Sequence, residues 1–142
     1  MTDAPADLSK LAIHTFTTKP LSLEEACAAY AEAGVPAITV WRQHVEPYGL
    51  VRAAAIVKGA GLAVPALCRG GFFPAPDATG RQAAIDDNRR ALDEAAALAA
   101  GMVVLVCGAV PGQTLATSRT QIRDGIAAIM EHAKSLGVRV AI

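Results

Sequence analysis

The segment from Leu62 to Pro74 changes its chemical character within a few residues. Its apolar first half, Leu62–Leu67, is typical of a buried strand, and the run Cys-Arg-Gly-Gly-Phe-Phe follows directly. Glycines allow a positive φ or a close approach to a ligand, and arginine carries a fork of donors that suits an anion. Ligand sites of α/β proteins gather at the carboxyl ends of parallel strands. We therefore expect four residues to contribute to substrate binding, namely Arg69, Gly70, Gly71 and Phe72; the alternative is a Gly-Gly turn with both phenylalanines covering the core.

Two other predicted strands also end in side chains that could bind a ligand. His14 lies near the carboxyl end of the first, where it could donate a hydrogen bond to a substrate, act as a base, or be satisfied by neighbouring backbone. Trp41 and Arg42 end the second strand. Trp41 could cover one face of a ligand, and Arg42 could bind a phosphate or carboxylate through two hydrogen bonds. Because adjacent strand residues point to opposite sides, we expect one of the pair, in the first place Trp41, to enter the pocket.

The other polar groups near the strand ends each have a simpler structural explanation. Cys107 ends the fourth strand, where a substrate contact competes with the usual role of a small buried thiol. His44 and Glu46 lie in an apparent loop and are expected to be solvated. Arg69 could instead form a salt bridge with the Asp86–Asp87 pair. Carboxylates are scarce at these strand ends, so this part of the chain is expected to hold a substrate and not to transfer its protons.

The elements that position these residues alternate between strands and helices. Four helix ends, AEAG, KGAG, LAAG and KSLG, each carry a glycine and precede a short apolar strand. The predicted strands are Leu11–Phe16, Ala37–Trp41, Leu62–Leu67, Met102–Cys107 and Val138–Ile142. The predicted helices run from a capping box of Ser22 and Glu25 to Gly34, over Tyr48–Ala60, from an N-cap within Asp77–Thr79 to Ala100, and over Leu115–Leu136.

This alternation predicts a parallel sheet with right-handed crossovers. No further helix or strand follows the last predicted strand, which ends at Ile142. Two architectures fit: a complete five-stranded domain of the flavodoxin-like kind, or the first half of a (β/α)8 barrel, which needs about 250 residues. The flavodoxin-like alternative lacks the composition of a phosphate-binding loop. Residues 1–10 are expected to be a polar leader, and residues 11–142 a partial barrel domain.

Composition narrows the classes of partner. Apolar residues make up 53% of the chain and charged residues 18%, and the formal net charge is zero, so we expect neither a nucleic-acid nor a membrane partner. The sequence contains no apolar stretch long enough to span a membrane, and we expect no signal peptide. The three cysteines are far apart in the sequence, which argues against a disulfide framework and favours a reducing cytoplasm.

The motifs at the strand ends resemble those of the sugar phosphate isomerase/epimerase family, the xylose isomerase-like TIM barrels. The resemblance rests on Trp41-Arg42 after strand two, Leu67–Phe73 (LCRGGFF) after strand three, Asp86–Arg89 (DDNR) in helix three and Leu105–Gly108 (LVCG) in strand four. It extends from Leu11 to Ile142. It implies the α/β fold of parallel βα units that forms the first half of a TIM barrel, and an enzyme that moves hydrogen between neighbouring carbons of a sugar or keto-sugar.

The resemblance also implies a divalent metal, Mn²⁺, Mg²⁺ or Co²⁺, in full-length members of the family. Their metal ligands begin with a glutamate right after strand five, where this sequence ends, so no ligand can be assigned and no metal is expected on this chain alone. The chain would then supply the substrate-binding half. A different class of function is a non-catalytic half-barrel that pairs through its open sheet edges into a homodimer.

Overall fold

A computed structural model describes residues 7–142, so residues 1–6 of the predicted leader lie outside the described residues. The strands are β1 (Ala12–His14), β2 (Ala37–Trp41), β3 (Leu67–Gly71), β4 (Met102–Val106) and β5 (Arg139–Ala141). The helices are α1 (Leu23–Glu32), α2 (Arg42–Val45), α3 (Leu50–Gly59), α4 (Ala78–Ala97) and α5 (Leu115–Leu136). Apart from the short helix α2, strands and helices alternate as predicted.

The strands form one open parallel sheet in the order β1-β2-β3-β4-β5. Each strand therefore pairs with the next one along the chain. A flavodoxin-like sheet would have the order 2-1-3-4-5, with the first two strands exchanged. The observed order is that of successive strands around a (β/α)8 barrel and excludes the flavodoxin-like alternative.

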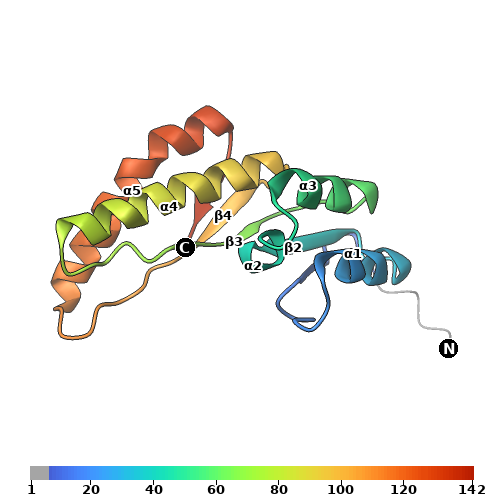
Figure 1. Ribbon diagram of the computed structural model, residues 1–142, viewed down its shortest axis with the longest axis horizontal. Helices are drawn as coiled ribbons and strands as arrows, with labels where there is room; N and C mark the ends of the chain where they lie inside the picture. Colours follow the sequence, from blue (N-terminus) through green and yellow to red (C-terminus); the bar gives the residue numbers. More distant parts are fainter. Residues whose placement is uncertain (1–6) are drawn as a thin grey trace.

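The helices cover one face of this sheet. In Figure 1, α3, α4 and α5 lie on the same side of the strands. Strand β4 shows the consequence for side chains, because Val103 and Leu105 are buried in the core shared with the helices, whereas Val106 on the other face is 38% exposed. The face without helices corresponds to the interior of a barrel, and its carboxyl edge is where a site is expected.

Local sequence signals account for where the helices begin and end. Ser22 and Glu25 form the predicted capping box of α1, each side chain bonding the other residue's backbone N–H. Asp77 accepts a hydrogen bond from the Gly80 N–H at the start of α4. Gly137 ends α5 with φ +67° and ψ +19°, a left-handed conformation that glycine adopts without a Cβ penalty.

The third strand differs from its predicted position. The sequence places it at Leu62–Leu67 with the Arg-Gly-Gly run after it, but β3 is Leu67–Gly71 and contains that run. Pro65 supplies no N–H for a ladder, and the segment before β3 pairs with β2 through an isolated bridge between Ala37 and Ala63 and a hydrogen bond from the Val40 N–H to the Ala66 carbonyl. Arg69 and both glycines therefore belong to the sheet itself.

The segment after β2 also differs from the prediction. The sequence predicts a loop around His44 and Glu46, yet Arg42–Val45 forms the single helical turn α2. Val45 is buried, which ties this turn to the core. None of the helices among residues 7–142 combines the length and the apolar character that crossing a membrane requires.

Candidate functional site

Five side chains meet at the carboxyl ends of β1, β2 and β3. His14 and Phe16 come from β1 and the turn after it, Trp41 from β2, and Arg69 and Phe72 from β3 and its end. The ring of Phe16 stacks on Trp41 with centroids 4.4 Å apart and 21° between the planes. The Arg69 guanidinium carbon lies 6.0 Å from the centre of the Trp41 ring and 4.5 Å from that of Phe72. We call this group the carboxyl-end cluster.

His14 and Trp41 are joined by a hydrogen bond. The Trp41 indole Nε1–H donates to His14 Nδ1 over 3.1 Å. An Nδ1 that accepts leaves the proton of the neutral imidazole on Nε2. The backbone on both sides is held as well, since Tyr30 donates to the His14 carbonyl and the Trp41 N–H donates to the hydroxyl of buried Thr15. His14 thus presents an N–H donor on a fixed ring.

Arg69 sits where the β3–β4 ladder changes register. Cys68 pairs with Val104 and Gly70 with Leu105, so Arg69 is the extra residue of a bulge. Bulges re-aim a side chain relative to the strand, and here the guanidinium lies against two aromatic rings. No carboxylate among residues 7–142 bonds to it, because Asp87 pairs with Arg42 and Arg90 and Asp86 pairs with Arg89. The alternative salt bridge of Arg69 to this aspartate pair is therefore not formed.

Gly70 and Gly71 hold the backbone that carries Arg69. Buried Asn88 of α4 accepts a hydrogen bond from the Gly71 N–H at 2.6 Å and donates to the Gly71 carbonyl at 2.8 Å. A Cβ on Gly70 would lie 2.5 Å from Asn88 Oδ1, and a Cβ on Gly71, whose φ is +101°, would collide with the Val106 backbone. Both glycines are therefore required by close packing, and no contact of theirs with a ligand is needed to explain them.

Arg42 is the first residue of α2 and is bound by helix α4. It forms two hydrogen bonds with Asp87 and two with Glu94. Its hydrogen bonds to Glu94 and Asp87 raise the pKa of the guanidinium and lower that of Asp87. Two carboxylates of α4 thus occupy the donors of Arg42 that were predicted to bind a substrate anion. We therefore assign Arg42 the role of linking the end of β2 to α4.

Replacing Arg42 tests this assignment. Arg42→Gln leaves the partly buried Glu94 without its cation and leaves Asp87 with Arg90 alone, and we expect it to lower the free energy of unfolding at pH 7 by about 2 kcal/mol. Asp87 has a pKa below 3.8 in the folded chain, so its stabilisation is complete above that value and is lost as the pH falls through the lowered pKa. Urea unfolding at pH 7 and about pH 3 should therefore show a smaller acid-induced loss in the variant than in the wild type. Equal losses would contradict the assignment.

A hollow of about 290 Å³ lies beside the cluster, lined by Arg69 and Phe72 and by Arg42, Gln43, Glu46 and Asp87. Glu46 thus comes close to the candidate site, although the sequence places it in a solvated loop. Asp77, the other acid near a strand end, caps α4 instead. His44, also expected to be solvated, has a buried Nδ1 without a partner, and burial lowers the pKa of its ring. The arrangement supplies donors, aromatic surface and two carboxylates, Glu46 and Asp87, of which Asp87 is already paired with Arg42 and Arg90.

The thiols contribute little to this chemistry. Cys27, Cys68 and Cys107 are all free, and burial raises the pKa of Cys27 to about 11 and also raises that of Cys68. A thiol with a raised pKa is a poor nucleophile and a poor metal ligand. Cys107 follows β4 and is partly exposed, and its predicted place in the substrate site stays a prediction.

The described residues do not fit a metal centre. Nowhere in the range 7–142 do three or more His, Cys, Asp or Glu side chains converge as a metal ion would need. Near the cluster, Asp87 is bound by Arg42 and Arg90, and the His14 Nδ1 is occupied by Trp41. No step of a reaction is therefore derived through a metal here.

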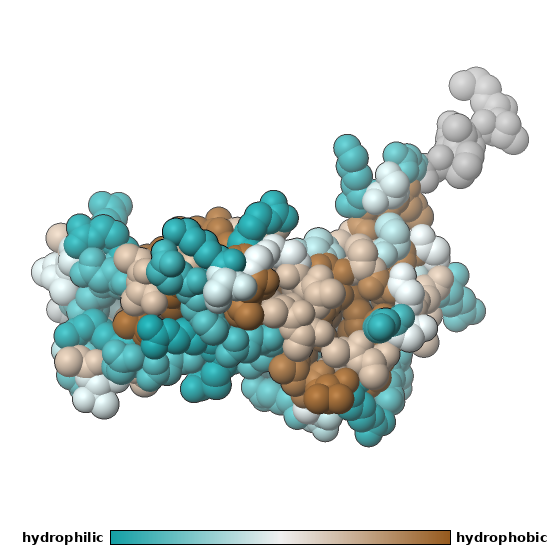
Figure 2. All heavy atoms as spheres, turned by 90° about the horizontal axis from the view of Figure 1, so that it is seen from above, coloured by the Kyte–Doolittle hydropathy of each residue, from teal (hydrophilic) through white to brown (hydrophobic). Residues whose placement is uncertain are grey.

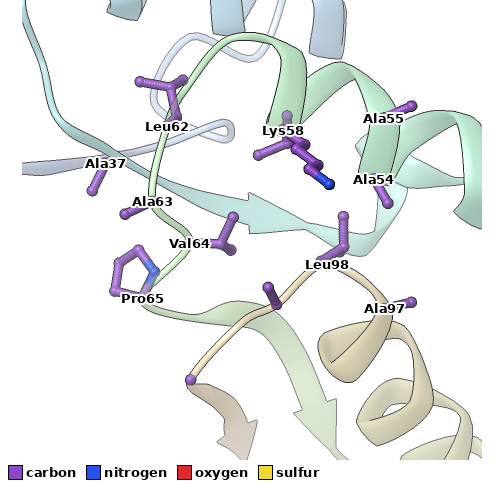
Figure 3. A pocket seen from close by; sticks show the side chains of 13 residues that line it. Ala37, Ala54, Ala55, Lys58, Leu62, Ala63, Val64, Pro65, Ala97 and Leu98 are labelled. Carbon is purple, nitrogen blue, oxygen red and sulfur yellow. The ribbon is translucent and has the colours of Figure 1, made fainter.

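A larger hollow of about 750 Å³ lies at the opposite end of the sheet (Figure 3). Its wall comes from the amino ends of β2 to β4 and from α3 and the end of α4, with Lys58 as the charged residue among alanines, Leu62, Val64 and Pro65. Figure 2 shows apolar side chains gathering on the half of the molecule away from α5. Because the sites of barrel enzymes lie at the carboxyl ends of the strands, this hollow is not the candidate site.

Two members of the site were missed in the sequence. Phe16 lies two residues after His14 in the apolar run LAIHTF, and that spacing could have placed both on one face. Asn88 is the second, because its two hydrogen bonds hold Gly71 of β3. No spacing rule connects it to Gly71, because the contact joins a helix to a strand.

Comparison with solved structures supports the architecture. A crystal structure of protein SMc04130 from Sinorhizobium meliloti 1021 matches 96% of the chain and 50% of its own length, with 45% identity and a TM-score of 0.90. D-psicose 3-epimerase in the presence of D-fructose (19% identity, TM-score 0.73) and the IOLI protein with a bound zinc atom (20%, 0.74) match 91% and 93% of the chain. Both matches cover 50% of the other protein, so this chain spans about half the length of these structures.

The sequence family points the same way. No curated protein matches the chain. The family model of the xylose isomerase-like TIM barrel matches residues 27–142, which include β2 to β5 and the whole of the Arg-Gly-Gly run. With five parallel strands in sequential order and an open sheet, the chain forms half of a TIM barrel and belongs to the xylose isomerase-like TIM barrel family.

Proposed function

We propose that this chain is the substrate-holding half of a sugar isomerase or epimerase. The observation that carries the proposal is the hydrogen bond between Trp41 and His14 at the carboxyl edge of the sheet. It turns the Nε2–H of His14 into a fixed donor beside a stacked aromatic surface. Such a pair suits a polyhydroxy ligand, whose C–H faces lie against rings and whose oxygens accept hydrogen bonds.

The residues present suit substrate binding, and not the proton transfer itself. Moving hydrogen between neighbouring carbons of a keto-sugar needs a base, and cationic or hydrogen-bonding groups for the developing oxyanion. Trp41 and Phe16 would hold the carbon skeleton, and His14 Nε2–H would donate to a ligand oxygen. The base and a divalent metal, Mn²⁺, Mg²⁺ or Co²⁺, would come from residues other than those described. The three free thiols suit a reducing compartment, and we place the protein in the cytoplasm.

Fluorescence offers a direct test, because Trp41 is the one tryptophan of the chain. Titration with D-fructose, D-psicose and D-tagatose should change its emission in a saturable way. His14→Ala should weaken binding about fivefold, which corresponds to the net free energy of one neutral hydrogen bond. His132→Ala is the matched control, because His132 pairs with Asp93 on the surface between α4 and α5. Emission that no keto-sugar alters, or equal losses in both variants, would rule the proposal out.

The oligomeric state is measured in parallel by light scattering. Strands β1 and β5 each have one unpaired edge in the described sheet, and a stable dimer through these edges would assign the chain to the homodimeric half-barrel instead.

A further inference from the structure

We infer that Arg69 forms an anion subsite, and that the sugar this site takes carries a carboxylate or a phosphate group. The inference rests on the proposed function and adds the chemical class of its substrate. It begins from a difference between two neighbouring arginines. Arg42 has its donors occupied by Asp87 and Glu94, whereas no carboxylate among the described residues bonds to Arg69.

The environment of Arg69 favours a ligand at its donor edge. The guanidinium lies over the Phe72 ring at 4.5 Å and near the Trp41 ring at 6.0 Å. Aromatic rings hold the guanidinium by cation–π attraction on its flat faces and leave the N–H groups at the rim free. The side chain is half-buried, so water competes less with an incoming anion than at an exposed arginine.

The backbone that carries Arg69 is fixed, which limits the entropy lost on binding. Gly71 is held by both of its backbone polar groups through Asn88, and the strand continues into the bond between the Phe72 N–H and the Val106 carbonyl at 2.7 Å. A planar fork on a rigid support suits the two oxygens of a carboxylate or phosphate. Two carboxylates line the same hollow: Asp87 is already paired with Arg42 and Arg90, and Glu46 forms no hydrogen bond with Arg69 in the described part of the chain.

The geometry also sets what the rest of the ligand must be. Trp41 is shared between the two halves of the cluster, because its indole N–H bonds His14 and its ring lies near Arg69. A ligand beside this ring would have the His14 imidazole and the Arg69 guanidinium as neighbours. A neutral sugar would use the first alone, and an anionic sugar would use both.

The test compares three keto-sugars that differ in one group: D-fructose, D-fructose 6-phosphate and D-fructuronate. Trp41 emission should show that at least one anionic sugar binds the wild type about ten- to 100-fold more tightly than D-fructose. Arg69→Gln should remove this preference, so that the anionic sugars bind the variant no more tightly than D-fructose does. Arg69→Lys keeps the charge without the fork and should retain part of the preference. Arg119→Gln, at an exposed position of α5, is the matched control and should change nothing.

Each outcome decides the inference. A preference for one anionic sugar identifies its group, phosphate or carboxylate, as the one bound. Equal affinities of the wild type for all three sugars, or a loss in Arg69→Gln that is the same for D-fructose, would overturn the anion subsite and leave the proposed function standing. No binding of any of the three would overturn both. Circular dichroism of the variants separates these results from a failure to fold.

Discussion

Gly71→Ala is expected to destabilise the chain by about 3–5 kcal/mol. The backbone of Gly71 has φ +101°, which side chains rarely adopt, and a Cβ there would lie 2.6 Å from the Val106 nitrogen and closer still to its carbonyl oxygen. Neither atom can move without breaking the pairing of β3 with β4. Urea unfolding followed by far-UV circular dichroism measures the loss.

A matched variant separates the collision from the conformational cost. Gly137 also has a positive φ, +67°, but nothing lies within 4 Å of the place where its Cβ would be. Gly137→Ala should therefore cost only about 1 kcal/mol, the usual price of a left-handed alanine. If the two alanine variants lose the same stability, the close approach of Gly71 to Val106 does not restrict this position.

The same glycine shows how far the sequence could predict the site. The change from an apolar run to Arg-Gly-Gly correctly marks a place where the backbone needs glycine, while the role of Arg69 in a site stays a prediction. This sequence pattern does not predict that Gly70 and Gly71 belong to the strand itself. That depends on Pro65, which weakens the ladder before β3, and on the bulge at Arg69 that β4 imposes.

Local signals predicted the fold well, because helix caps and glycine stops act within a few residues. The capping box at Ser22 and the full extent of α5 are confirmed. The partners of charged groups could not be predicted in the same way. Arg42 meets Glu94 across 52 positions of sequence, and only the crossover from β2 through α3 and β3 to α4 brings them together.

Asn88→Ala is the second variant with a large expected effect. Asn88 is 1% exposed and makes three hydrogen bonds, with the N–H and carbonyl of Gly71 and with the carbonyl of Ala84. Truncation leaves the two polar groups of Gly71 buried and unpaired, which should lower the free energy of unfolding by about 3 kcal/mol. Gln82→Ala removes an exposed hydrogen bond to Asp86 on the same helix and should change stability by less than about 0.5 kcal/mol.

Asn88→Asp distinguishes lost hydrogen bonds from lost packing. It keeps the size of the side chain and the acceptor for the Gly71 N–H, but it turns a donor into an oxygen that faces the carbonyls of Gly71 and Ala84. Ionisation is disfavoured there, so the folded chain holds the proton more tightly than the unfolded chain. The variant should be most stable at low pH and lose stability as the pH rises, whereas Asn88→Ala should show no such added dependence on pH. Parallel pH profiles for the two variants would mean that Asn88 fills space and does not clamp the strand that carries Arg69.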